Sequence, residues 1–242
     1  MSSNTLVLPL ASAPDSRLRR PRAVVLDASG TLLYPTRPIG DIYAETALRH
    51  GATLDRAALQ AGFVRAFRQL IHREPGTIPS DGCDRVWWRQ VVKLSVAECA
   101  LPTDFPFEAY FEELYLVFAQ PEIWALYDDV LPALQKLQAA GITLALLSNW
   151  DWRLNPLIDG LGLGEYLPKE RRFISAERGA QKPHDAIYAL VEKELALPAA
   201  DILLAGDEPD YDVTPAQARG WQAWHVQRPG QTLLHLAQLI AD

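Results

Sequence analysis

Polar residues that can do chemistry follow three apolar runs of the sequence. Asp27 follows the first run and Asp207 follows the third, while Ser148 and Asn149 follow the second. Short apolar runs of this kind are typical of buried parallel strands. In a parallel α/β sheet, ligands bind beyond the carboxyl ends of the strands. The sequence therefore predicts one active site built from these strand ends.

The loop after the first run offers a nucleophile. A carboxylate such as Asp27 can attack phosphorus or carbon and form a covalent intermediate. Gly30, three residues later, allows the backbone to turn sharply around a ligand. Asp and Ser-Gly residues also form ordinary turns, so this segment alone favours neither interpretation.

The other candidates also have a chemical and a structural interpretation. Ser148, before an expected helix, can hold a phosphate oxygen with nearby amides, although a serine there is more often a helix cap. Lys182, at the head of an expected helix, can neutralise charge on a nucleophile and a phosphoryl group, or it is an exposed lysine. Asp207 and Asp212 are hard oxygen ligands suited to Mg²⁺, or they belong to a solvated acidic loop.

The pattern around these residues predicts two kinds of structure. Between about residues 40 and 120, apolar residues recur at helical spacing, which predicts about four helices and no strand. After residue 120, strands and helices alternate, which predicts a parallel sheet with helices on both faces. Strands are expected at 142–147, 173–175, 202–205 and 223–226, and helices at 129–140, 153–161, 185–195, 214–219 and 233–240.

Length and composition limit the class of protein. A chain of 242 residues accommodates a core plus a smaller inserted domain. A net charge of −7 gives no electrostatic support for a nucleic-acid partner. No apolar run has the length of a membrane span, and two cysteines favour a reducing cytoplasm over a disulfide scaffold. Residues 1–21 are expected to be a disordered leader rather than a signal peptide, because no basic segment precedes the short apolar stretch.

The order and spacing of the candidates are specific although each is weak alone. Asp27, then Ser148-Asn149, then Lys182-Pro183, then Gly206-Asp207 with Asp212 five residues on, resembles the four-motif signature of the haloacid dehalogenase-like (HAD) hydrolase superfamily. The resemblance runs from about residue 22 to 226. It extends to the subfamily with a helical cap inserted after the first strand. Residues 86–92, 148–151 and 181–183 look like the proteins described as haloacid dehalogenase-like hydrolase domain-containing.

The resemblance implies a fold, a domain arrangement and a reaction. The fold would be α/β, with a Rossmann-like three-layer parallel sheet core (22–36 and 121–242) and an inserted helical-bundle cap (37–120). Asp27 would attack a phosphoryl group and become an aspartyl phosphate. Mg²⁺ would be held by Asp27, the backbone carbonyl of Ser29 and Asp207, with Asp212 in support.

The same resemblance implies roles for the substrate-binding residues. Ser148, with Asn149 beside it, would bind a phosphoryl oxygen. Lys182 would stabilise the charge around Asp27, and Thr31 would brace the loop. The cap would close over the site and select a small phosphorylated or halogenated molecule.

The sequence departs from the phosphatase pattern at Ser29. The phosphatase motif is Asp-x-Asp-x-Thr, and its second Asp protonates the leaving group and later activates water. Ser29 can donate a hydrogen bond but cannot carry a proton near neutral pH, and loss of a general acid/base typically removes about 10²- to 10⁴-fold in rate. Asp151 is a candidate replacement for this acid, although a role in a salt bridge or as a helix-capping residue is the favoured interpretation.

Three other interpretations remain open. Haloacid dehalogenases also lack the second Asp, but they act without metal and lack the ligand that Asp207 provides. Phosphonate-cleaving relatives use a cap lysine, and Lys93 is the only lysine of the expected cap. A non-catalytic phosphate-binding or interaction role is the third. Trp150 is expected to pack or to line the pocket, and Arg37 to mark the hinge or to bind an anion.

Overall fold

A five-stranded parallel sheet forms the centre of the larger part of the molecule. The computed structural model describes residues 18–70 and 78–241. The strands lie in the order β5-β4-β1-β6-β7 and all neighbouring pairs are parallel. Their bounds are β1 (Ala23–Leu26), β4 (Thr143–Ser148), β5 (Arg172–Ile174), β6 (Ile202–Gly206) and β7 (Gln222–His225). The predicted α/β class with a parallel sheet is confirmed.

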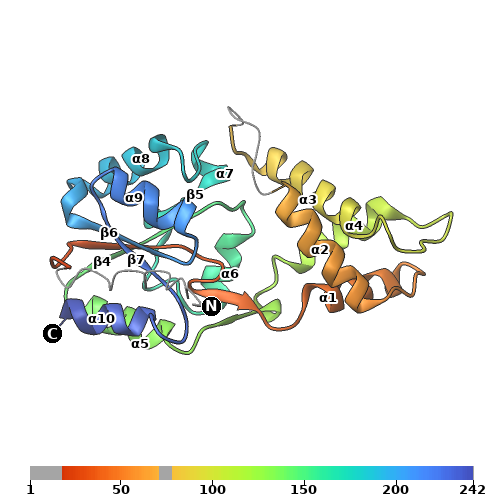
Figure 1. The fold of residues 1–242 in the computed structure, drawn as a ribbon, viewed down its shortest axis with the longest axis horizontal. Coiled ribbons are helices and arrows are strands. Elements are labelled where there is room, and N and C mark those ends of the chain that lie inside the picture. Colours follow the sequence, from red (N-terminus) through yellow and green to blue (C-terminus); the bar gives the residue numbers. More distant parts are fainter. Residues whose placement is uncertain (1–17, 71–77, 242) are drawn as a thin grey trace, which may run out of the picture.

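Helices cover both faces of the sheet because the central strands are apolar on both sides. On β1, Val24 and Leu26 face one hydrophobic cluster, while Ala23 and Val25 face another. The first cluster includes side chains of α5 (Val130–Ala139), α6 (Leu154–Gly160) and α10 (Leu233–Ala241). The second includes side chains of α8 (Asp185–Leu195) and α9 (Thr214–Ala218). Figure 1 shows these layers above and below the sheet.

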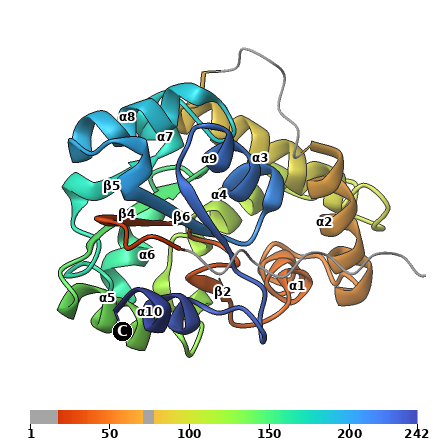
Figure 2. The ribbon, with the colours of Figure 1, turned by 60° about the vertical axis from the view of Figure 1, so that its left-hand side comes forward.

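Four further helices lie together beside the sheet (Figures 1 and 2). They are α1 (Ile39–Arg49), α2 (Arg56–Leu70), α3 (Asp81–Ser95) and α4 (Phe107–Val117). They bury a hydrophobic cluster of their own, in which Tyr43, Leu59, Val92, Tyr110 and Phe111 are almost fully enclosed. This helical unit occupies the segment expected to be the cap, and no strand is found among its described residues.

The two connections between the helical unit and the sheet pair with each other. Strand β2 (Leu33–Pro35) leads into the helices, and β3 (Trp124–Leu126) leads back to the sheet. The two strands are antiparallel, with Leu33 opposite Leu126 and Pro35 opposite Trp124. Sequence periodicity does not predict these three-residue strands, because their pairing depends on residues about 90 positions apart in the chain.

Short helical segments complete the described structure. They are η1 (Pro121–Ile123), η2 (Lys169–Arg171), α7 (Ser175–Arg178), η3 (Ala199–Asp201) and η4 (Pro209–Val213). Residues 1–17 of the expected leader lie outside the described residues. Its last residues contact the sheet domain: Leu18 packs on the core, and the Arg19 amide donates to Gln222 Oε1 at 2.8 Å. Among the described residues, every helix is too short or too polar to cross a membrane.

Candidate active site

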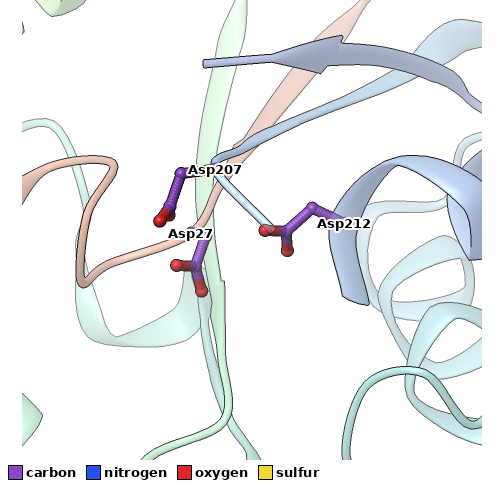
Figure 3. Close-up of side chains that lie close together, drawn as sticks. All are labelled: Asp27, Asp207 and Asp212. Carbon is purple, nitrogen blue, oxygen red and sulfur yellow. The ribbon is translucent and has the colours of Figure 1, made fainter. Parts of the chain in front are cut away.

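Three carboxylates meet at the carboxyl ends of the two central strands. Asp27 directly follows β1, Asp207 directly follows β6, and Asp212 comes from the helical turn η4. Carboxylate oxygens of all three lie within 4.8 Å of one another, and Figure 3 shows them grouped together. Strands β1 and β6 are neighbours in register, with Leu26 beside Ala205, so the residues after them must lie side by side. Among the described residues, this is the one group of three or more possible metal ligands.

Lys182 supplies the positive charge of the site. Its ammonium group donates to Asp27 Oδ1 at 2.7 Å and to Asp212 Oδ1 at 2.5 Å. All three side chains are buried, with Lys182 3% exposed and Asp212 1% exposed. A buried charge is tolerated when it is paired and hydrogen-bonded. Two carboxylates and one ammonium therefore form a compact cluster with one excess negative charge.

Burial and like charge perturb the acids of this cluster. Burial raises the pKa of Asp27 to about 7, an effect that the Lys182 ammonium partly offsets and Asp212 reinforces. Burial also raises the pKa of Asp207, against the hydrogen bond from Thr31. The pKa of Lys182 is raised above its ordinary value, because its two carboxylate partners outweigh the effect of burial. Lys182 therefore remains a cation at neutral pH. A further cation near Asp27 would favour the ionised form of this carboxyl group and lower its pKa.

The loop after β1 is pressed against Asp207. Gly30 has a φ of +79°, a conformation that favours glycine, and a Cβ at this position would lie 2.2 Å from Asp207 Oδ2. The buried Thr31 hydroxyl donates to Asp207 Oδ1 at 2.9 Å. On the other side, a Cβ at Gly206 would lie 2.2 Å from Asp212. Because these two glycines have no side chain, the Asp207 and Asp212 carboxylates can lie directly against the backbone.

Ser148 and Asn149 lie at the end of β4, next to β1. Ser148 is buried. The side-chain amide of Asn149 is paired with the backbone of Lys182: Nδ2 donates to the Lys182 carbonyl and Oδ1 accepts from the Lys182 amide, both at 2.8 Å. The expectation that Asn149 binds a phosphoryl oxygen stays a prediction, and the contacts give this residue a positioning role for Lys182.

Ser29 and Asp151, the two residues considered as proton carriers, differ in their surroundings. Ser29 lies in the loop beside Asp27 and is exposed. Asp151 is fully buried and forms a two-pronged ion pair with Arg153, with Nε–Oδ1 at 2.9 Å and Nη2–Oδ2 at 2.8 Å. It also accepts a hydrogen bond from the Tyr115 hydroxyl at 3.0 Å. The salt-bridge interpretation of Asp151 is therefore confirmed, and its oxygens are committed to these partners.

Two further residues expected near the site have structural partners. Arg37 forms an ion pair with Glu45 at 2.5 Å, at the start of the helical unit. The Trp150 ring packs against Trp124 of β3, with centroids 5.4 Å apart. Both residues therefore lie where the helical unit and the sheet meet, and Trp150 has the packing role that was one of its two interpretations.

Two residues that support the site are not singled out by the sequence. His225 Nε2 lies 3.1 Å from the Asp207 carbonyl, and Arg228 donates to the carbonyls of Gly30 and Thr31. His225 is the last residue of the edge strand β7, and Arg228 lies three residues beyond it, in a segment without a recognised motif. The strand-end rule that identified Asp27 and Asp207 applies to β7 as well, and would have directed attention to them.

Comparison with known proteins places the chain in a family. The family model for haloacid dehalogenase-like hydrolase matches residues 21–220. A relative from Danio rerio, haloacid dehalogenase-like hydrolase domain-containing protein 3, is 27% identical over 89% of this chain and 88% of its own length. The fold is similar to that of an L-2-haloacid dehalogenase from Xanthobacter autotrophicus (TM-score 0.65, 22% identity, 91% of this chain and 87% of the other). It is also similar to a HAD phosphatase from Thermococcus onnurineus (TM-score 0.62, 20% identity, 90% and 97%). This chain belongs to the haloacid dehalogenase-like hydrolase family.

Proposed function

We propose that this protein is a Mg²⁺-dependent phosphohydrolase that works through an aspartyl phosphate on Asp27. The observation that carries the proposal is the group of three carboxylates, Asp27, Asp207 and Asp212, with oxygens within 4.8 Å of one another. Carboxylate oxygens are the ligands that Mg²⁺ prefers. A dication also suits a buried cluster whose negative charge exceeds its positive charge. Asp27, Asp207 and the backbone carbonyl of Ser29 would hold the ion, with Asp212 in support.

The reaction has two displacements at phosphorus. In the first, an Asp27 carboxylate oxygen forms a bond to phosphorus while the bond from phosphorus to the leaving oxygen breaks. In the second, water attacks the phosphorus, the bond to Asp27 breaks, and phosphate and the free carboxylate result. When bound, Mg²⁺ would supply electrostatic stabilisation of the phosphoryl oxygens.

Other residues of the site bind and orient. Lys182, 2.7 Å from Asp27, favours the ionised form of the attacking carboxylate and balances the phosphoryl charge. The Ser148 hydroxyl binds a phosphoryl oxygen. Asn149 fixes the Lys182 backbone through two hydrogen bonds, and Thr31 holds the Asp207 carboxylate. The helical unit acts as the cap that closes over the site and selects the substrate, a small phosphorylated molecule of the cytoplasm.

Ser29 limits which phosphoesters are hydrolysed. The leaving oxygen of an alkyl phosphate needs a proton, and a serine hydroxyl does not supply one near neutral pH. Asp151, the nearest alternative by sequence, is committed to Arg153 and Tyr115. Acyl and aryl phosphates have leaving groups that need little protonation. We therefore expect these substrates to be hydrolysed faster than alkyl phosphates.

The test is hydrolysis of an aryl phosphate and an acyl phosphate, with Mg²⁺ and with EDTA, by wild type and by Asp27→Asn. Turnover that requires Mg²⁺ and disappears in the variant is the expected result. Turnover that persists in Asp27→Asn would instead point to a contaminating phosphatase. A clean protein with no turnover on either substrate would remove the phosphohydrolase proposal.

Dehalogenase-type chemistry on Asp27 is the second candidate, and Ser29 is the observation that favours it. Release of halide from an L-2-haloacid by the EDTA-treated protein would support it, because this reaction needs no metal. Phosphonatase chemistry has less support, since Lys93 is exposed near the end of α3. Borohydride trapping with a phosphonate tests that route. Tight phosphate binding without any turnover would indicate the non-catalytic role.

A further inference from the structure

We propose that Arg228 is a positioning residue for the loop that carries the proposed metal ligand Ser29, an inference that rests on the proposed function. Arg228 lies three residues beyond the end of β7. Its Nη1 donates to the Gly30 carbonyl at 2.9 Å, and its Nη2 donates to the Thr31 carbonyl at 2.7 Å. The two carbonyls that follow the Ser29 carbonyl in the loop are therefore held by one guanidinium fork.

The Arg228 guanidinium is held in place by Asp129 and Tyr127. Its Nε donates to Asp129 Oδ1 at 2.9 Å and its Nη2 to Asp129 Oδ2 at 3.3 Å. The second Asp129 oxygen also accepts from the Leu233 amide at 2.8 Å, at the start of α10. The Tyr127 ring covers the guanidinium, 3.7 Å from its centroid. With four donor contacts and a stacked ring, the fork has one orientation.

This orientation matters because the residues that Arg228 holds are the ones that contact Asp207. Gly30 approaches the Asp207 carboxylate so closely that a Cβ would lie 2.2 Å from Oδ2, and the Thr31 hydroxyl donates to Oδ1 at 2.9 Å. If the Gly30 and Thr31 carbonyls were released, the loop would no longer be held against this carboxylate. Arg228 thus controls the distance between the Ser29 carbonyl and Asp207 through the loop. None of its described contacts is with the Asp27 or the Asp207 carboxylate.

The experiment compares Arg228→Lys with wild type in two measurements on the full chain. The first is hydrogen exchange of residues 28–33 in metal-free protein. The second is the dissociation constant of Mg²⁺ by calorimetry in the absence of substrate. Lysine keeps the charge but cannot bridge two carbonyls and Asp129 together. We expect faster exchange in this segment and a dissociation constant about 10-fold higher, as for other residues that orient metal ligands.

Arg172→Lys is the matched control. Like Arg228, Arg172 donates hydrogen bonds to a backbone carbonyl, that of Leu167, and to a side chain, that of Asn155. It is buried, whereas Arg228 is partly buried, and it lies on the edge strand β5. A loss of stability in both variants with no change in exchange of residues 28–33 or in Mg²⁺ affinity would overturn the proposal, because it would show a merely structural role. If Arg228→Lys does not fold, Asp129→Asn weakens the same fork and is judged by the same two measurements.

The two proposals fail in different ways. If wild type binds no Mg²⁺, the metal-dependent phosphohydrolase is wrong. Hydrogen exchange still decides the role of Arg228 in that case, because it needs no metal. Faster exchange confined to residues 28–33 would support the positioning role, and unchanged exchange would contradict it.

Discussion

At the scale of single residues, the site combines the proposed nucleophile, a carboxylate whose pKa is raised by burial, with the Lys182 ammonium that partly offsets this effect. Asp27 is 8% exposed and has another carboxylate, Asp212, on the same lysine. Such clusters of buried, like charges are typical of functional sites rather than of stabilising ion pairs. The free energy of unfolding should therefore depend on whether the Asp27 carboxyl group is protonated or ionised.

The charge of Asp27 predicts an unusual dependence of stability on pH in EDTA. Its pKa is raised to about 7 in the folded protein, mainly by burial, compared with an ordinary value of 3.8. The folded state therefore binds the proton more tightly, and stability falls as pH rises from about 4 to about 7. We expect Asp27→Asn to have a higher Tm than wild type at pH 8, with the difference vanishing at pH 4. The control is Asp210→Asn, an exposed acid of the same segment, and an equal gain in that variant would contradict the explanation.

Restoring the missing acid predicts a change in substrate range. Ser29→Asp introduces a carboxylate at the position where phosphatases of this family carry their proton donor. We expect kcat/KM for an alkyl phosphate to rise by about 10²- to 10⁴-fold, and to rise much less for an aryl phosphate. Steady-state kinetics on the two substrates measures this difference. Equal gains on both, or none on the alkyl phosphate, would show that proton transfer is not the limitation.

At the scale of elements, the segment after β4 connects the site to the helical unit. The Arg153 guanidinium lies between two aromatic rings of that unit, 3.8 Å from the Tyr115 centroid and 5.3 Å from that of Trp88. Its neighbour Trp152 donates its amide to Asp81 at the start of α3. The chain that provides Ser148 thus continues directly into the contacts that orient α3 and α4.

Removing this cation predicts a large loss of stability. Arg153→Leu leaves Asp151 buried without its ionic partner, and breaking such a pair costs about 3–5 kcal/mol. The double variant Asp151→Leu/Arg153→Leu should recover part of the loss, because no unpaired charge then remains. Denaturant unfolding of both variants measures the difference. A double variant less stable than Arg153→Leu would contradict the electrostatic explanation.

The bounds of the helices and strands around the site could largely be predicted from the sequence. The boundaries of α8 were predicted to the residue, and β4, β6 and β7 to within one residue at each end, because periodic apolar runs reflect burial locally. The strand ends at Asp27, Ser148 and Asp207 followed from the same signal. The strand-end signal also covers the end of β7, near Arg228. The hydrogen bonds of Arg228, the Asn149–Lys182 pair and the β2–β3 pairing could not be predicted, because they join residues about 30 to 200 positions apart in the chain.

At the scale of the whole molecule, a ligand that binds only the folded site must stabilise the fold. The carboxylates come from β1, β6 and η4, so the cluster exists only when the sheet is assembled. At free Mg²⁺ 100 times its dissociation constant, the free energy of unfolding should rise by about 2.7 kcal/mol. Denaturant unfolding with Mg²⁺ and with EDTA checks this. Asp207→Asn should abolish the gain and Asp210→Asn should keep it, and a gain that survives in Asp207→Asn would place the ion elsewhere.

The pairing of β2 with β3 has a consequence for how such proteins diversify. The chain leaves the sheet domain and returns to it along one two-stranded ribbon, with Leu33 opposite Leu126. Everything between these strands is a loop in the topological sense, however large it is. Insertions, deletions or wholesale replacement of the helices need not rethread the sheet or move Asp27. If the proposed function holds, the helices that select the substrate can therefore differ between relatives while the sheet and Asp27 stay in place.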